Sequence, residues 1–184
     1  MTALNSVPYL AEHPGRSSRL VAAEVSLGYG DRTVVDALSV AIPDAAVTVI
    51  VGANACGKST LLRGMARLLK PTAGAVLLDE PTTFLDVSHQ IEVLDLLRDL
   101  NASRGTTVVM VLHDLNLAAR YADHLVALTR GRVVAAGPPG DVVTEELVRD
   151  VFGLDSLVVE DPVSGTPLVV PIGRHTRLAT GAGR

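Results

Sequence analysis

The chain has 184 residues, of which 48% are hydrophobic and 20% are charged, and its formal net charge is −4. The length suits one domain, with room for a small appendage, and the composition excludes a wholly disordered chain. The net negative charge gives no indication of a basic surface that would bind nucleic acid. No apolar run approaches the roughly 18 residues of a membrane span.

The first half of the chain alternates extended segments with one helix. In order, we expect a loose leader over 1–18, extended segments over 20–27 and 33–42, and a short strand over 47–51. The last of these is apolar throughout, as in a parallel strand that is buried on both faces. Leucines and a methionine at helical spacing predict a helix over 59–69, which Pro71 and Gly74 should end.

The second half continues the alternation. We expect a strand over 75–78, a helix from Asp86 or Ser88 to Gly105, a strand over 106–112, a helix over 116–121, and extended segments over 125–128 and 133–136. We then expect a loop over 137–140, a helix that is capped by Thr144 and ends at Phe152, a hairpin over 157–160 and 168–170, and a frayed tail over 174–184. Alternating strands and helices predict an α/β architecture around a parallel sheet.

The clearest motif is GANACGKST over 52–60, which fits G-x-x-x-x-G-K-[ST] between a predicted strand and a predicted helix. Backbone N–H groups of such a loop face a polyanion, Lys58 neutralises the outer phosphates, and the Ser59 hydroxyl is a ligand for Mg²⁺. A chance glycine loop is the alternative, and the flanking elements disfavour it. The expected nucleotide-binding residues here are Gly52, Asn54, Ala55, Cys56, Gly57, Lys58, Ser59 and Thr60.

A second motif is the apolar stretch that ends in Asp79 and Glu80. At the carboxyl end of a strand beside the phosphate loop, Asp79 can hold Mg²⁺ through water, and Glu80 can act as the general base that polarises an attacking water. An ordinary acidic turn is the alternative.

Two further residues have both a functional and an ordinary interpretation. His113 follows the strand 106–112 and can contact a γ-phosphate, but alone it would be a solvated histidine at a strand end. Tyr29 lies between two glycines and either packs partly into the core or forms a platform for an adenine base. The remaining histidines show no ligand spacing, and nothing indicates a catalytic thiol at Cys56.

Together these motifs resemble the nucleotide-binding subunits of ABC transporters, most of all the importer ATPases for ferric siderophores and vitamin B12. The matching segments are the adenine-contacting loop over 27–30, the Walker A motif over 52–60, the Walker B motif over 77–82, the D-loop over 84–86 and the switch-histidine segment over 111–116. The stretch 131–137 and the terminal hairpin suit the siderophore branch. The resemblance implies a RecA-like P-loop core with a small N-terminal β part, in which the histidine strand lies between the two Walker strands.

The chain also departs from this family. Its members carry a Q-loop glutamine, a helical subdomain and a Leu-Ser-Gly-Gly-Gln-type signature between Walker A and Walker B, whereas this chain has no Gly-Gly pair and its one glutamine is Gln90. The seam lies over 74–80, and we expect these residues to form the Walker B strand. Ala45 and Ala55 replace usual glycines, and each costs about 1–2 kcal/mol if its φ must be positive.

The resemblance implies ATP and Mg²⁺ as ligands, and a second ATPase subunit and a membrane permease as partners. We expect a truncated ABC-type ATP-binding domain over 19–173 that descends from ATPases driving iron–siderophore import, with activity impaired by loss of the signature region. A non-catalytic nucleotide-binding remnant, or an interaction partner of an intact ATPase, is the alternative. A single cysteine and a first segment without a signal-peptide pattern favour a cytoplasmic protein, peripheral to the membrane when assembled with a permease.

Overall fold

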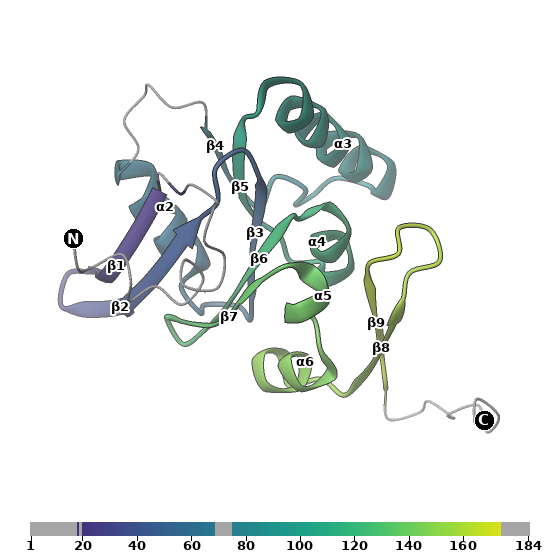
Figure 1. Cartoon of the computed structure of the whole chain (residues 1–184). Helices are drawn as coiled ribbons and strands as arrows, with labels where there is room; N and C mark the ends of the chain where they lie inside the picture. Colours follow the sequence, from purple (N-terminus) through teal and green to yellow (C-terminus); the bar gives the residue numbers. More distant parts are fainter. Residues whose placement is uncertain (1–17, 19, 69–74, 174–184) are drawn as a thin grey trace.

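The computed structural model describes residue 18, residues 20–68 and residues 75–173 (Figure 1). Residues 1–17 of the predicted leader, residue 74 of the seam and the predicted tail over 174–184 lie outside the described residues. In chain order the elements are β1 (Leu20–Tyr29), β2 (Arg32–Ile42), β3 (Val47–Gly52), α2 (Lys58–Leu68), β4 (Ala75–Asp79), α3 (Val87–Arg104), β5 (Thr107–Val111), α4 (Leu115–Tyr121), β6 (His124–Thr129), β7 (Arg132–Gly137), α5 (Pro139–Val142), α6 (Glu145–Phe152), β8 (Ser156–Glu160) and β9 (Pro167–Pro171).

A five-stranded sheet with the order β4-β5-β3-β6-β7 forms the centre of the molecule. The strands β4, β5, β3 and β6 are parallel, as expected, but β7 pairs antiparallel with β6, so the sheet is mixed rather than wholly parallel. The switch-histidine strand β5 lies between β4 and β3, which confirms the order implied by the family resemblance. The carboxyl ends of the parallel strands therefore meet at one edge of the sheet.

Apolar side chains cover both faces of this sheet. Along β3, Val49 contributes to a cluster with helices α3 and α4, whereas its neighbour Ile50 faces a second cluster with α2 and the β1–β2 hairpin. Successive side chains of a strand point to opposite faces, so β3 is buried on both sides, and all its residues are buried. Figure 1 shows the β1–β2 hairpin and α2 on one side of the sheet and α3 and α4 on the other.

The helix ends follow local capping chemistry. Asp86 caps α3 by accepting a hydrogen bond from the backbone N–H of His89 at 3.0 Å, and Gly105 ends it with a left-handed φ of 60°. Thr144 caps α6 in the same way, as predicted. The prediction of a loop over 137–140 is wrong in part, since helix α5 begins at Pro139. The fixed φ and missing N–H of proline suit the first position of a helix.

Residues 69–74 are all that separates α2 from β4, so no helical subdomain lies between them. The strand β4 pairs in parallel with β5 in the register Asp79↔Val111, as a Walker B strand would. It lies at the edge of the sheet, and its residues 75–78 are only half-buried, whereas every residue of β5 is buried. No helix in the described parts of the chain is long and apolar enough to cross a membrane.

Candidate nucleotide-binding site

A phosphate loop joins the end of β3 to the start of α2, and its glycines are required by geometry. A Cβ on Gly52 would lie 2.2 Å from the carbonyl oxygen of Leu128 and 2.8 Å from Sγ of Cys56, so no side chain fits there. Gly57 has a φ of 105°, which side chains rarely tolerate. The first and last glycines of the motif therefore let the loop turn tightly against the sheet.

Two alanines adopt the backbone conformation that the sequence analysis identified as costly. The φ angles are 54° at Ala45, before β3, and 60° at Ala55, inside the phosphate loop. In this left-handed region a Cβ approaches the following carbonyl oxygen, at a cost of about 1–2 kcal/mol per residue. Both alanines therefore have the positive φ that was expected to be costly. The turn before β3 and the phosphate loop each contain one strained residue.

Lys58 places its ammonium group inside the loop. Its Nζ donates hydrogen bonds to the carbonyl oxygens of Gly52 and Ala53, each at 3.0 Å, and the residue is only 5% exposed. Because α2 begins at Lys58, the first N–H groups of this helix have no intrahelical acceptor and carry the positive end of its dipole. Ammonium and helix terminus together make a site for a polyanion such as the phosphates of a nucleotide.

The first turn of α2 meets the carboxyl end of β4 at Ser59 and Asp79. The Ser59 hydroxyl donates to Oδ1 of Asp79 at 2.9 Å, as expected for two residues that share one cation. Hydroxyl and carboxylate oxygens suit Mg²⁺, which usually keeps several waters and takes other ligands from substrate phosphates. The donor set fits that ion, and the described residues hold no group of three or more histidines, cysteines or carboxylates that suggests another metal.

Glu80 and His113 form a second pair at the same edge of the sheet. Nε2 of His113 lies 2.6 Å from Oε1 of Glu80, and the hydroxyl of Thr83 donates to Oε2 of Glu80 at 3.2 Å. Glu80 also has a φ of 50°, a strained conformation of the kind found at functional sites. Its carboxylate is a suitable acceptor for a proton from water.

The predicted residues meet around one cavity of about 460 Å³. Its lining consists of loop and helix residues 54–60 together with Glu80 and His113. Asp79 and Gly52 support this lining through Ser59 and Lys58, respectively. The cavity thus combines a glycine-containing loop with a buried ammonium group, a hydroxyl–carboxylate pair that suits Mg²⁺, and a carboxylate–imidazole pair.

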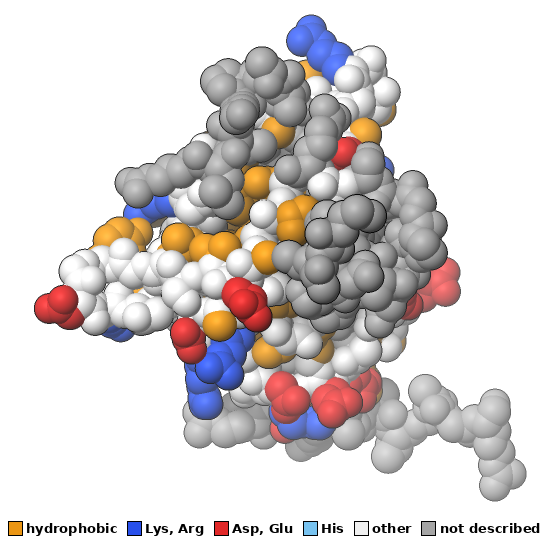
Figure 2. Space-filling model, turned by 60° about the vertical axis from the view of Figure 1, so that its left-hand side comes forward, with side chains coloured by type: hydrophobic (Ala, Val, Ile, Leu, Met, Phe, Trp, Pro, Cys, Tyr) orange, Lys and Arg blue, Asp and Glu red, His pale blue; other side chains and the backbone are white. Residues whose placement is uncertain are grey.

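Tyr29 lines a neighbouring, mainly apolar cavity of about 320 Å³, which shares Thr60 with the first. Its side chain is 56% exposed and is therefore not a core residue. Nη1 of Arg63 donates to the Tyr29 hydroxyl at 3.2 Å, and this contact raises the pKa of Arg63 above its ordinary value. Figure 2 shows hydrophobic side chains gathered on the face of the molecule that carries these N-terminal elements.

Sequence reasoning missed three residues that support the site. Arg63 lies 3.9 Å from Asp79, and its position four residues after Ser59 on a helix was a usable signal. Thr83 fixes one oxygen of Glu80, and no spacing rule indicated it. The N–H of Gly131 in the β6–β7 turn donates to the carbonyl oxygen of Cys56 at 2.8 Å and so supports the phosphate loop.

Comparison with known sequences gives consistent matches. Residues 35–125 match the family model of the ABC transporter. The chain is 34% identical to the achromobactin transport ATP-binding protein CbrD of Dickeya dadantii and to the ferric enterobactin transport ATP-binding protein FepC of Escherichia coli, in alignments that cover 85% of this chain and 96% and 95% of those proteins. The alignments run over 257 and 258 positions, more than the 184 residues here, so both relatives contain residues that this chain lacks.

The fold also matches solved structures. CbiO1 from Clostridium perfringens, part of the ABC transporter complex CbiONQ, superposes with a TM-score of 0.62 at 17% sequence identity. The match covers 73% of this chain and 94% of that one. At this identity the likeness concerns the fold, and it agrees with the α/β architecture described above.

Proposed function

This chain belongs to the ABC transporter family of ATP-binding proteins, related to the ATPases of siderophore importers, and on that premise we propose that it binds Mg-ATP at the cavity described above. One observation carries the proposal: the phosphate loop, the Ser59–Asp79 pair and the Glu80–His113 pair surround a single cavity. Each supplies a different requirement of nucleotide binding, and they come from separate parts of the chain.

The proposed roles follow from the chemistry of each group. Lys58 and the start of α2 bind the phosphates, while Ser59 and Asp79 hold Mg²⁺, which neutralises phosphate charge when bound. Tyr29 offers its ring to the base, because it is exposed beside Thr60 at the edge of the phosphate site. Glu80 accepts a proton from a water aimed at the terminal phosphate, and His113 contacts that phosphate.

We further propose that hydrolysis is slow. Phosphoryl transfer depends mainly on positioning and on stabilising the charge of the transferred group. In the intact family, the signature segment of a second subunit closes the site. That segment lies between Walker A and Walker B, where this chain has only residues 69–74 between α2 and β4. Removing one preorganised donor costs about 10²–10³ in rate, so the loss of a whole wall should cost at least as much.

The transport role proposed for the parent of this chain is to power iron–siderophore import through a membrane permease. The names of CbrD and FepC, which refer to achromobactin and ferric enterobactin transport, support this assignment. The helical subdomain that meets the permease in the family is missing, which disfavours ordinary assembly. A role at the inner face of the membrane would therefore require an intact partner subunit.

A second candidate function is a nucleotide-binding remnant that pairs with an intact ATPase. It is favoured by an exposed apolar pair just after the Walker B glutamate, in which Phe84 is fully exposed and Val87 is 76% exposed. This chain would then supply one Walker face, and the partner would supply the signature.

ATP turnover by the purified chain separates the two functions. The chain alone should turn over slowly, and titration with an intact homologous subunit should raise the rate if a mixed site forms. Robust turnover by the chain alone that Glu80→Gln abolishes would contradict the impairment. Absence of any rate increase in the mixture would reject the partner role.

A further inference from the structure

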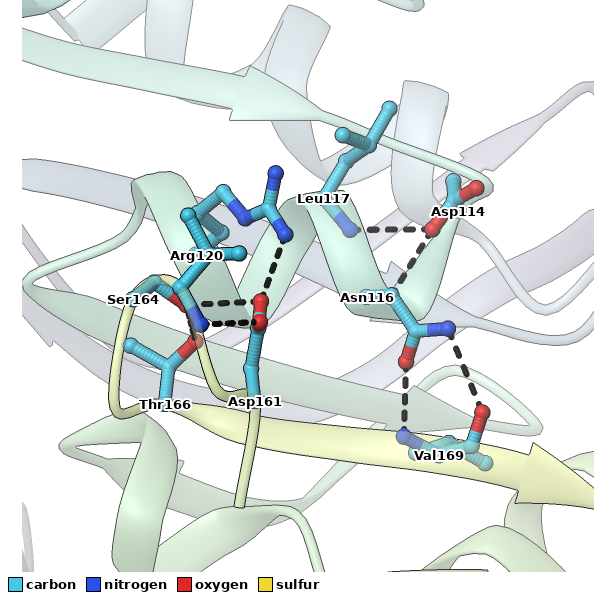
Figure 3. A network of polar contacts seen from close by, with 9 residues as sticks. Asp114, Asn116, Leu117, Arg120, Asp161, Ser164, Thr166 and Val169 are labelled. Atoms are coloured by element: carbon cyan, nitrogen blue, oxygen red, sulfur yellow. Dashed lines mark hydrogen bonds and ion pairs between the residues drawn. The ribbon is translucent and has the colours of Figure 1, made fainter. Parts of the chain in front are cut away.

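The C-terminal hairpin is joined to helix α4 by two polar contacts (Figure 3). The side-chain amide of Asn116 pairs with the backbone of Val169 in β9: Oδ1 accepts from the Val169 N–H at 2.7 Å, and Nδ2 donates to the Val169 carbonyl at 3.2 Å. One helical turn later, Nη2 of Arg120 lies 2.5 Å from Oδ2 of Asp161, at the end of β8. Residues four apart share a helix face, so both contacts lie on one side of α4.

The hairpin end of this connection is well ordered by its own hydrogen bonds. Asp161 accepts from the N–H of Val163 at 2.9 Å and from the hydroxyl of Ser164 at 2.8 Å, and its own N–H donates to the carbonyl of Thr166 at 2.8 Å. The N–H of Val163, then Arg120 and the hydroxyl of Ser164, hold the pKa of the Asp161 carboxyl well below its usual range. Arg120 therefore contacts a fixed, charged acceptor rather than a mobile turn.

The other end of the connection leads directly to the proposed catalytic pair. Oδ1 of Asp114 accepts from the N–H groups of Asn116 and Leu117, at 2.8 and 2.9 Å, and so caps α4. His113 immediately precedes this cap and reaches Glu80 at 2.6 Å. A displacement of the start of α4 would therefore move the imidazole relative to the carboxylate.

Packing holds the later residues of α4, where Ala118 and Ala119 are fully buried, whereas the start of the helix borders a pocket. A cavity of about 260 Å³ lies between residues 113–116, helix α6 and strand β9. Its lining includes Phe152, Leu154 and Pro171 as well as His113 and Asn116. Beside this pocket, the directed hydrogen bonds of Asn116 connect the start of α4 to β9.

We propose that Asn116 is a positioning residue for His113, so that the C-terminal hairpin determines where the imidazole stands relative to Glu80. The inference rests on the proposed function, because it concerns the reaction assigned to that pair. Asn116 touches neither the phosphate loop nor the magnesium-ligand pair. Its removal should therefore disturb the His113–Glu80 geometry and change ATP affinity little, because Lys58 and the start of α2 provide most of the phosphate binding.

The test uses the full chain and does not depend on turnover. The variants are Asn116→Ala and, as a matched control, Asn101→Ala, which loses a similarly half-buried amide-to-backbone bond from Asn101 to Thr106 at 2.8 Å, at the far end of α3. Hydrogen exchange of the amides of residues 115–117 and the imidazole NMR signals of His113 are measured, with Glu80→Gln as the reference for a broken pair.

Asn116→Ala should raise exchange at residues 115–117 by about tenfold and move the His113 signals toward those seen in Glu80→Gln, while Asn101→Ala should change neither. His113 signals that stay at the wild-type position in a folded Asn116→Ala protein would overturn the proposal. If that variant does not fold, Asn116→Gln decides, because it keeps an uncharged amide that is one methylene too long for both bonds to Val169. It should give a smaller shift in the same direction, and no shift would overturn the proposal.

Turnover separates this inference from the proposed function. Where the wild type hydrolyses ATP, Asn116→Ala should lower kcat by about tenfold without changing the Kd for ATP. A wild type without turnover would reject hydrolysis, while the NMR comparison would still test the positioning role. An equal loss of ATP affinity would contradict positioning and indicate a general structural defect.

Discussion

The imidazole of His113 lies 2.6 Å from the carboxylate of Glu80, although the two residues follow different strands. The parallel pairing of β4 with β5, in the register Asp79↔Val111, brings both strand ends to the same edge of the sheet. Thr83 holds the second carboxylate oxygen of Glu80 at 3.2 Å. Each oxygen thus has one partner, which orients the carboxylate and leaves a further lone pair for a water that gives its proton to Glu80.

Replacing the strained alanines should stabilise the fold. Ala45→Gly and Ala55→Gly each remove about 1–2 kcal/mol of strain and add about 0.5–1 kcal/mol of unfolded-state entropy, so each should raise the free energy of unfolding by roughly 0.5–1 kcal/mol. Because φ is 60° at Ala55 in the folded loop, its gain should appear in the free energy of unfolding.

Urea unfolding of both variants beside Ala46→Gly measures this effect. Ala46 has no positive φ, so its replacement should destabilise the protein. Equal losses of stability in all three variants would show that the positive φ angles carry no strain.

Tyr29 should contribute through its ring. Tyr29→Ala is expected to weaken ATP binding by about 1 kcal/mol, whereas Tyr29→Phe should be nearly neutral, because the Arg63–Tyr29 contact is exposed to water. Isothermal titration calorimetry of the three proteins measures the difference. Equal losses in both variants would assign the effect to the hydroxyl and to its contact with Arg63.

The Arg120–Asp161 ion pair should make the free energy of unfolding depend on pH. The folded pKa of Asp161 is lowered, mainly by the N–H of Val163 and then by Arg120, so its contribution is present at neutral pH and is lost as the pH falls below about 4. Asp161→Asn should therefore lower the urea midpoint at neutral pH, with a smaller difference near pH 2.

Asp155→Asn is the matched control, because the Asp155–Arg149 pair is exposed: the side chain of Asp155 is 69% exposed, against 7% for Asp161. It should change the midpoint little at either pH. A pH-independent loss in Asp161→Asn would assign the effect to packing rather than to charge.

The exposed apolar surface should make the chain associate. Phe84 is fully exposed, Val87 is 76% exposed, and β4 is an edge strand of the sheet. We expect concentration-dependent association in sedimentation experiments, and Phe84→Ser should reduce it without lowering the melting temperature. A monodisperse wild-type monomer that melts well above the mesophilic range of about 45–65 °C would contradict this prediction.

Local chemistry made much of the fold predictable. Capping residues such as Asp86 and Thr144, and the left-handed Gly105, fixed helix ends that the sequence analysis placed correctly. The apolar run over 47–51 identified a strand buried on both faces. The extended segment over 133–136 was predicted, but its antiparallel pairing as β7 was not, because periodicity does not give strand direction. The short helix at Pro139 was not predicted, because four residues give no clear periodicity.

The site was predictable only where a motif defined it. The loop 52–60 and the strand-end carboxylates follow sequence patterns, whereas Thr83, Gly131 and Asn116 act through contacts between distant segments. The order of the strands came from the family resemblance, since periodicity does not say which strands are neighbours. The contact of Asn116 with Val169 joins α4 to the separate β8–β9 hairpin, and no sequence pattern indicated that these two segments are neighbours.

The most direct test of the central claim is a calorimetric titration of ATP, with and without Mg²⁺, into the wild type, Lys58→Ala and Arg104→Ala. The wild type and Arg104→Ala, which alters the far end of α3, should bind ATP with a Mg²⁺-dependent affinity, and Lys58→Ala should show no binding. ATP affinity in Lys58→Ala equal to that of the wild type would contradict the assignment of the loop 52–60 as the nucleotide site.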